Sequence, residues 1–187
     1  MIQTKTQLRR LLKTRRAQGP RAQHQAWSRS AQAHLLSSPL WIHARSVALY
    51  HPFPSEVSTA LLLRAAWADQ KRVVLPITPP MGQPLRFVQV HPETPRVPGP
   101  MGTQEPPGDS LHVLAEDLDL VILPGLGWDS TGTRMGYGGG YYDRSFATSS
   151  AQRIQLAFAL QEQPGLPREA HDLPMHGVVT EQGLHFL

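Results

Sequence analysis

One short stretch of the chain carries the residue types needed to hold a phosphate group. Residues 134–143 read Arg-Met-Gly-Tyr-Gly-Gly-Gly-Tyr-Tyr-Asp, with four glycines within five positions. Glycines let backbone N–H groups approach an anion closely, and an arginine can clamp the same phosphate through paired hydrogen bonds. The aspartate at the end, Asp143, is the ligand type that a Mg²⁺ ion carried by the phosphate prefers. The stretch therefore predicts an anion site between Arg134 and Asp143.

The residues before the glycines predict what positions them. Residues 119–125 read Asp-Leu-Val-Ile-Leu-Pro-Gly, an apolar run typical of a buried strand that leads into a loop. A helix is expected over residues 141–150. A strand, a glycine-rich loop and then a helix form the layout of a nucleotide site in α/β proteins.

The rest of the chain also predicts an α/β protein. Helices are expected over residues 4–18, 21–37 and 57–69, with Thr4 and Ser55 as N-caps of the first and third. Strands are expected over residues 47–50, 72–76, 85–90, 118–123 and 154–160, with a terminal hairpin from 178–180 and 184–187. Right-handed crossovers between such strands give a mostly parallel sheet. Residues 91–110, rich in Pro, Gly and Thr, are expected to form a long surface loop.

Length and composition narrow the class of protein. A chain of 187 residues without a composition break predicts one domain over 1–187, with the basic helices of residues 1–38 packed on it. The net charge is +4, and the first 21 residues hold much of the excess and no acid, which favours a polyanionic partner. The absence of cysteine excludes disulfides, thiolate zinc sites and cysteine nucleophiles. Because no signal-peptide core or membrane-span window occurs, we expect a cytoplasmic protein without membrane contact.

Several separated blocks together resemble one enzyme family. The largest are residues 123–129 (Leu-Pro-Gly-Leu-Gly-Trp-Asp) and 132–143, and they are similar to the signature of 5-formyltetrahydrofolate cyclo-ligases, also called methenyltetrahydrofolate synthetases. Smaller blocks in the same order also resemble that family: residues 5–9, 56–59, 71–76, Gly102 with 105–106, 171–172 and 178–181. Each short block is weak alone, but the combination spans nearly the whole chain.

This resemblance implies a fold, a reaction and a set of ligands. The implied fold is a three-layer α/β/α sandwich with a mostly parallel central sheet. The implied reaction is the ATP- and Mg²⁺-dependent cyclisation of 5-formyltetrahydrofolate to 5,10-methenyltetrahydrofolate, with release of ADP and phosphate through a phosphorylated formyl intermediate. The implied partners are these two substrates, with no nucleic acid or membrane, and we expect a monomer.

Because phosphoryl transfer depends on positioning and charge neutralisation, the site needs cations and N–H donors more than a nucleophile. By the resemblance, Arg134 and Lys5 are the catalytic cations. Lys5 and Arg9 are four residues apart, which puts both on one helical face within reach of one anion. The family assigns ATP binding to two segments: Lys5, Thr6, Gln7, Leu8 and Arg9, then Arg134, Met135, Gly136, Tyr137, Gly138, Gly139, Gly140, Tyr141 and Tyr142. Arg10, Lys13, Arg15 and Arg16 are expected to form an ordinary solvated face.

The resemblance assigns the folate to other side chains. Glu56 would accept hydrogen bonds from the N–H groups of the pterin ring, since a carboxylate matches paired donors. His51 is a further candidate, and Tyr137, Gly138, Gly139, Gly140 and Tyr141 would also contact the substrate. The alternative for Glu56 is a glutamate at the start of a helix, favoured by the helix dipole.

Asp143 and Asp172 are the implied Mg²⁺ ligands, because a hard cation prefers carboxylate oxygens. Asp143 could instead stabilise a helix start, Asp172 could be a simple turn residue, and His171 is expected to be structural. One departure from the family is His176, which replaces an acid found in many relatives, so a second carboxylate beside Asp172 is in doubt.

Three other functions fit parts of the sequence. A nucleic-acid module would use the basic N-terminal helix and the Gly/Tyr block, although no RNA-binding signature is present. An enzyme acting on phosphosugars or coenzyme A could share the architecture, since fold does not fix function. A protein that binds folate or ATP without turnover is the third alternative.

Overall fold

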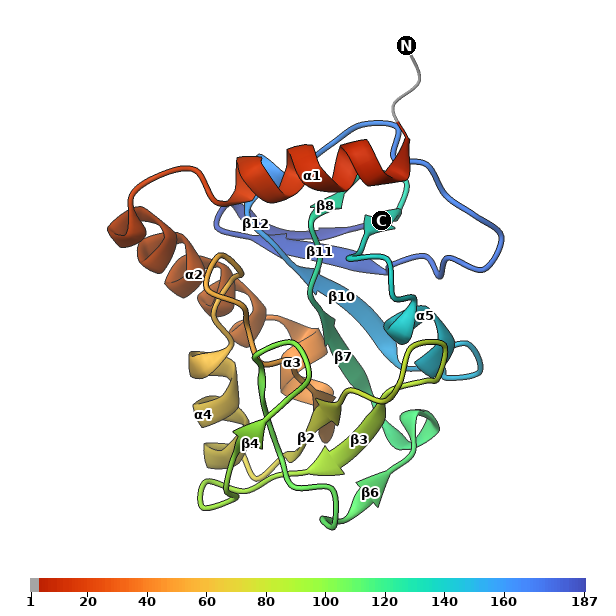
Figure 1. The fold of residues 1–187 in the computed structure, drawn as a ribbon. Coiled ribbons are helices and arrows are strands. Elements are labelled where there is room, and N and C mark those ends of the chain that lie inside the picture. The colour runs from red at the N-terminus through yellow and green to blue at the C-terminus, as the bar shows by residue number, and fades with distance from the viewer. Residues whose placement is uncertain (1–3) are drawn as a thin grey trace.

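The computed structural model describes residues 4–187 and builds them around one large sheet (Figure 1). Five α-helices are described: α1 (Lys5–Arg16), α2 (Arg21–Leu36), α3 (Pro39–His43), α4 (Ala60–Ala68) and α5 (Tyr141–Ser145). Two short 3-10 helices are η1 (Ala115–Asp117) and η2 (Ala159–Gln161). The sheet contains β1 (Ser46–Ala48), β2 (Arg72–Ile77), β3 (Arg86–Gln89), β6 (His112–Val113), β7 (Leu120–Leu123), β10 (Gln152–Leu156), β11 (Gly177–Thr180) and β12 (Gly183–Phe186). Two small hairpins pair β4 (Val97–Pro98) with β5 (Gln104–Glu105) and β8 (Gly127–Trp128) with β9 (Arg134–Met135).

The sheet is parallel in its centre and antiparallel at both edges. Its order is β12-β11-β10-β7-β1-β2-β3-β6, with parallel pairing from β11 through β2. The chain leaves β1 toward β2 and later returns to β7 on the other side of β1, so the connections diverge between β1 and β7. Ligand sites in such sheets form at the carboxyl ends of the strands beside this switch point.

The two faces of the sheet are covered unequally. On one face, α2, α3 and α4 contribute Leu35, Trp41 and Leu62 to a core with Ile122 and Leu156. On the other face the second core contains Phe146, next to α5, together with residues from loops. Figure 1 shows α2–α4 on one side of the sheet and α5 on the other. The predicted three-layer, mostly parallel α/β arrangement is therefore present, with a thinner second helical layer.

Helix α1 lies across one end of the sheet rather than on either face (Figure 1). Thr4 is its N-cap, as predicted. The Thr4 hydroxyl accepts from the Gln7 N–H at 3.2 Å, and the Gln7 side chain accepts from the Thr4 N–H at 2.9 Å. This reciprocal capping satisfies two donors that a helix start leaves free. Leu8 and Leu12 form one buried stripe, four residues apart, and they pack with Leu126, Met135 and Leu166.

Several predicted boundaries were wrong for local reasons. No helix was predicted between residues 37 and 57, but Pro39 starts α3, since Ser38 caps the Trp41 N–H and proline suits a first helical turn. The helix predicted over 57–69 begins at Ala60 with Thr59 as N-cap, so the predicted Ser55 cap is wrong. The helix predicted over 141–150 ends at Ser145. The strand predicted to reach residue 160 ends at Leu156, because the chain turns into η2.

The segment 91–110 is not wholly irregular, as was expected, because it contains the β4–β5 hairpin. Glu105 fixes this hairpin to the end of β2: its carboxylate accepts from the Thr78 N–H at 3.1 Å and from the Thr78 hydroxyl at 2.7 Å. The side chain is nearly buried, and the Thr103 hydroxyl is a third donor at 3.0 Å. The hairpin is thereby held beside the carboxyl end of β2. Among the helices of residues 4–187, none combines the length and apolar character needed to cross a membrane.

Candidate active site

A cleft of about 450 Å³ opens at the carboxyl ends of the central strands. Tyr50 and His51 follow β1, Pro124 follows β7, and Thr78 follows β2, so the cleft lies at the switch point between β1 and β7. Helix α1 and the glycine segment 136–140 close one side, and Met101 of the β4–β5 hairpin closes another. The topology therefore brings residues from both ends of the sequence to one cavity.

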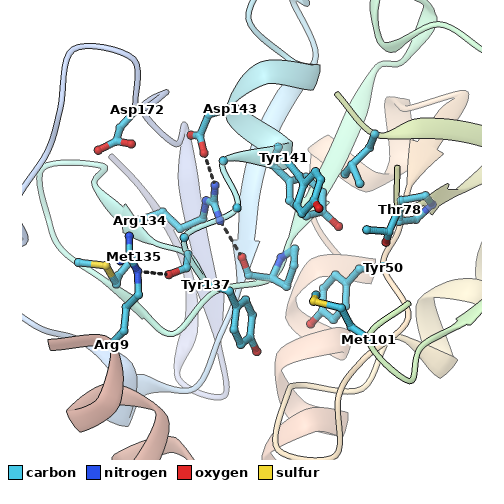
Figure 2. Close-up of a pocket in the computed structure, with 18 of the residues that line it drawn as sticks. Arg9, Tyr50, Thr78, Met101, Arg134, Met135, Tyr137, Tyr141, Asp143 and Asp172 are labelled. Carbon is cyan, nitrogen blue, oxygen red and sulfur yellow. Dashed lines mark hydrogen bonds and ion pairs between the residues drawn. The ribbon is translucent and has the colours of Figure 1, made fainter. Parts of the chain in front are cut away.

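The cleft has a charged half and a less polar half. Figure 2 shows Arg9, Arg134, Asp143 and Asp172 on one side, and Tyr50, Thr78 and Met101 on the other. The ring of Tyr137 lies between the two groups. Such a division suits a ligand pair in which one member is highly charged and the other presents a flat ring.

The glycine segment runs along the charged half and contacts α1. Gly138 has a φ of +102°, and a Cβ there would lie 3.2 Å from the Arg9 guanidinium carbon. Arg9 also donates from Nε to the Gly136 carbonyl at 3.1 Å. Gly140, with φ +61°, is the residue before α5. Backbone conformation favours glycine at both positions, and at Gly138 the close approach of Arg9 on α1 also favours it.

The hairpin β8–β9 separates the buried strand β7 from the glycine segment, and it delivers Arg134 to the cleft. Arg134 donates from Nη1 to the Pro124 carbonyl at 3.2 Å and pairs through Nη2 with Asp143 Oδ2 at 3.1 Å. The other Asp143 oxygen accepts from the Leu173 N–H at 3.1 Å. Both side chains are mostly buried, at 8% and 14% exposed. Arg134 and Asp143, predicted to act separately on phosphate and metal, are partners of one another in this structure.

Lys5 links α1 to the loop before β11. Its Nζ lies 2.9 Å from Asp172 Oδ2 and 3.0 Å from Glu169 Oε1. Burial lowers the pKa of Lys5, but the hydrogen bonds and charges of the two carboxylates outweigh it, and the net pKa is raised. Burial opposes ionisation of Asp172, whereas the Glu169 N–H and Lys5 favour the charged form, so the net pKa of Asp172 is lowered.

Ligand atoms of Glu169, His171 and Asp172 all lie within 4.8 Å of one another, so this trio of the described residues could hold a cation. Asp143 is not part of that trio. His171 is 71% exposed and lies 3.3 Å from Glu169. Asp143 and Asp172 line the same cleft, and each carboxylate keeps acceptor positions beyond the bonds given above. The oxygen donors present therefore fit a Mg²⁺ ion that arrives with a phosphate group.

Glu56 forms the centre of a buried polar network at the less polar half. Its Oε1 accepts from the Tyr137 hydroxyl and from Arg16 Nη1 at 3.3 Å, and its Oε2 accepts from the Phe53 N–H at 2.9 Å. The side chains of Arg16 and Glu56 are only 1% and 4% exposed. Burial raises the pKa of Glu56, although Arg16 and the Tyr137 hydroxyl act in the opposite direction.

The comparisons with known proteins agree with this geometry. Residues 1–181 match the 5-formyltetrahydrofolate cyclo-ligase family. The 5-formyltetrahydrofolate cyclo-ligases of Haemophilus influenzae and Escherichia coli are each 33% identical to the chain, over 84% and 89% of it and 87% and 93% of their own lengths. The solved 5,10-methenyltetrahydrofolate synthetase of Aquifex aeolicus is similar with a TM-score of 0.85 and 29% identity, over 97% of this chain and 92% of that one. The chain belongs to the 5-formyltetrahydrofolate cyclo-ligase family. It is therefore an enzyme of the ligase class.

The structure of this family member collects nearly all of the predicted site residues. Every predicted residue lines the cleft except Thr6, Gln7 and Leu8. Leu8 is buried in the small core beneath α1, Gln7 closes the helix cap, and Thr6 is exposed. For these three residues, a direct contact with nucleotide is not supported by their position.

For Arg16, the prediction of an exposed position was wrong. It was expected on a solvated face, but its guanidinium is buried and donates to Glu56, Ser55, Tyr137 and the Gly125 carbonyl. The spacing contained a signal, because Arg16 continues the buried stripe of Leu8 and Leu12 at intervals of four. A charged residue on an apolar stripe requires a buried partner, and Glu56 is that partner.

The departure at His176 lies outside the cleft. His176 Nδ1 accepts from the Arg153 N–H at 3.0 Å, and its other ring nitrogen lies 3.0 Å from Arg153 Nη2. Burial and the charge of Arg153 lower the pKa of His176. This histidine therefore joins β10 to the start of β11 and has no position among the cleft residues of this cyclo-ligase family member.

Proposed function

We propose that the protein catalyses ATP- and Mg²⁺-dependent cyclisation of 5-formyltetrahydrofolate to 5,10-methenyltetrahydrofolate, giving ADP and phosphate. The observation that carries the proposal is the single cleft shared by Glu56, the glycine segment 136–140 and the cations of α1. A reaction between a folate and a nucleotide needs both ligands side by side. The two unlike halves of the cleft supply suitable surroundings for each.

The chemistry begins at an unreactive group, because the formyl amide is stabilised by resonance and its oxygen is a poor leaving group. Transfer of the γ-phosphoryl group of ATP to that oxygen gives an imino phosphate. N10 of the folate then attacks the activated carbon and loses its proton, the bond from this carbon to the phosphorylated oxygen breaks, and phosphate leaves. Because the transferred group is highly charged, the protein must mainly position and neutralise it.

The cations around the glycine segment are suited to that task. Arg134 and Arg9 present guanidinium groups to the cleft, and Lys5 adds an ammonium group at the start of α1. In the proposal, Arg134 and Lys5 contact the transferred phosphoryl group, and backbone N–H groups of residues 136–140 hold the rest of the triphosphate. Arg134 must then exchange part of its bond to Asp143 for a phosphate oxygen.

Asp143 and Asp172 are the proposed ligands of Mg²⁺, which neutralises phosphate charge when it is bound. Their carboxylates belong to the charged half of the cleft (Figure 2). Because Lys5 lies within 3 Å of Asp172, the protein balances this charge by itself before nucleotide binds. We therefore infer that the ion enters together with the triphosphate.

Glu56 is the proposed acceptor for the pterin, and Tyr50, His51 and Tyr141 surround the same half of the cleft. Burial and the nearby charge of Arg96 lower the pKa of His51, so this residue is neutral near pH 7. A neutral imidazole can donate or accept a hydrogen bond without repelling Arg96. The 2-amino-4-oxo ring offers adjacent N–H donors that a fixed carboxylate can accept.

The test uses the purified protein with ATP, Mg²⁺ and 5-formyltetrahydrofolate, and it follows the absorbance of methenyltetrahydrofolate and the release of phosphate. Product should require both ATP and Mg²⁺, and Glu56→Gln should raise the KM for folate. Absence of product while both ligands still bind would exclude the enzyme proposal and favour a binding protein. The Lys13→Met variant, altered on the exposed face of α1, is the matched control.

A further inference from the structure

Tyr137 competes with any ligand for Glu56. Its hydroxyl donates to Glu56 Oε1 and accepts from Arg16 Nη2 at 2.7 Å. Its ring lies edge-on to Phe53, with centroids 5.6 Å apart, and the Phe53 N–H donates to Glu56 Oε2. The free protein therefore uses a residue of the glycine segment to fill part of the acceptor capacity of Glu56.

A count of acceptor positions shows what a ligand must displace. A carboxylate oxygen has about two lone pairs for hydrogen bonds. Oε1 already accepts from Tyr137 and Arg16, whereas Oε2 accepts from Phe53 alone. A planar ring with two adjacent N–H donors needs one position on each oxygen. Oε2 has a free position, but on Oε1 either Tyr137 or Arg16 must give way.

The surroundings decide which of the two residues moves. Arg16 is 1% exposed, and its guanidinium also donates to Ser55 Oγ at 2.9 Å and to the Gly125 carbonyl at 2.9 Å. Tyr137 is 37% exposed and stands between Gly136 and Gly138, where the backbone has the most conformational freedom. Arg16 also keeps the buried carboxylate charged, so its departure would leave an uncompensated charge. Of the two donors to Glu56 Oε1, Tyr137 is therefore held less firmly than Arg16.

We infer that the Tyr137 hydroxyl is a displaceable plug: it occupies an acceptor position on Glu56 in the free protein, and the paired N–H donors of the folate ring displace it when the substrate binds. This inference rests on the proposed function, because it takes the folate as the ligand of Glu56. Tyr137 is part of the segment proposed to hold the triphosphate, so its release also frees residues 136–140 to adjust to the nucleotide. Folate binding and the shape of the nucleotide loop are thereby coupled through one hydroxyl group.

The plug makes a prediction opposite to that for an ordinary binding residue. Tyr137→Phe keeps the ring against Phe53 but removes the competing hydroxyl, so 5-formyltetrahydrofolate should bind about fivefold more tightly without nucleotide. Glu56→Gln should weaken the same binding about tenfold or more. Lys13→Met is the control, because Lys13 lies on the exposed face of α1 and is not among the residues that line the cleft. The control should not tighten binding.

A second measurement follows the loop itself by amide hydrogen exchange of residues 136–140. In the wild type, 5-formyltetrahydrofolate alone should speed exchange in this segment, and Tyr137→Phe should show the faster exchange already without ligand. The inferred displacement of Tyr137 would be overturned by weaker or unchanged folate binding in Tyr137→Phe. It would also be overturned if this substitution left the amide hydrogen exchange of residues 136–140 unaltered. Wild-type protein that fails to bind 5-formyltetrahydrofolate would instead refute the proposed function, so the two failures are distinct.

Discussion

Arg16 of α1 and Glu56 of the loop after β1 form a buried ion pair, with Nη1 and Oε1 3.3 Å apart. Removing one partner of such a pair leaves an unpaired buried charge, which costs about 3 to 5 kcal/mol. Arg16→Met should therefore lower the free energy of unfolding by that amount, as measured by urea denaturation. The neighbouring Arg15→Met should cost about 1 kcal/mol or less, because Arg15 is partly exposed and its guanidinium bonds the Glu162 carbonyl and Gln163.

A double variant separates stability from ligand binding. Arg16→Met combined with Glu56→Gln removes both charges, so part of the lost stability should return while folate affinity stays low. Equal destabilisation by Arg15→Met and Arg16→Met would contradict the importance of the buried pair.

The ionisation of Glu56 should control folate binding at mildly acidic pH. Burial raises the pKa of this carboxyl above the ordinary value of 4.5, and the pterin donors require its charged form. Affinity for 5-formyltetrahydrofolate should therefore fall as the pH decreases through a value above 4.5. Titrations of the wild type and Glu56→Gln against pH test this, because the variant should lose this part of the pH dependence.

The raised pKa of Glu56 affects folding stability in the opposite direction, because acid favours the folded state here while it weakens folate binding. Because the pKa of Glu56 is higher in the folded than in the unfolded chain, its contribution to stability is full below about pH 4.5 and is lost as the pH rises through the folded value. Asp172, whose pKa is lowered, contributes stability above its unfolded value, and this is lost as the pH falls through its folded value. Denaturation of Glu56→Gln across this range separates the two, since only the Asp172 effect should remain.

Local patterns in the sequence predicted the helices and strands better than the side-chain contacts between them. The Thr4 cap and the apolar run of β7 are signals carried by adjacent residues, and both predictions were confirmed. The contact between Arg16 and Glu56 joins residues 40 positions apart, which periodicity cannot reveal. The attachment of Glu105 to Thr78 is of the same kind, and it explains why an apparently irregular segment is partly ordered.

The glycine block was recognised from its residues, but its immediate setting was not. The β8–β9 hairpin that separates it from β7 has only two residues in each strand, too few for an alternating pattern to appear. The helix after it has five residues and ends at Ser145, just before the buried Phe146. The pairing of Arg134 with Asp143 likewise joins β9 to this short helix across nine positions, which no local pattern marks.

Lys5 should contribute mainly to nucleotide binding. Lys5→Met removes the ammonium group at the start of α1 and leaves Asp172 and Glu169 without their cation, so repulsion of the triphosphate increases. We expect the KM for ATP to rise about tenfold, a loss of about 1.4 kcal/mol, with little change in folate affinity. Steady-state kinetics with Lys5→Arg should show partial recovery. A matching rise in the KM for folate would argue against this division of the cleft.

Asp143→Asn distinguishes a metal ligand from a partner of Arg134. The substitution keeps the shape that accepts the Leu173 N–H but removes the charge opposite Arg134. If Asp143 binds Mg²⁺, turnover should fall at least tenfold while folate affinity stays, and a higher Mg²⁺ concentration should restore part of the rate. Turnover equal to that of the wild type would remove Asp143 from the proposed metal site. A rate loss insensitive to Mg²⁺ would assign it to positioning Arg134.

Within the glycine segment, Gly138 is the position where an added side chain would press on Arg9. Its φ of +102° strains any L side chain, and an added Cβ would lie 3.2 Å from the guanidinium carbon of Arg9. Gly165→Ala is a suitable control, because Gly165 also has a positive φ, +70°, but a Cβ there meets nothing within 4 Å. Both variants should lose about 1 kcal/mol of stability from backbone strain. Only Gly138→Ala should also weaken binding of a non-hydrolysable ATP analogue, because only it moves Arg9, and equal nucleotide affinity in the two variants would show that this segment does not hold the triphosphate.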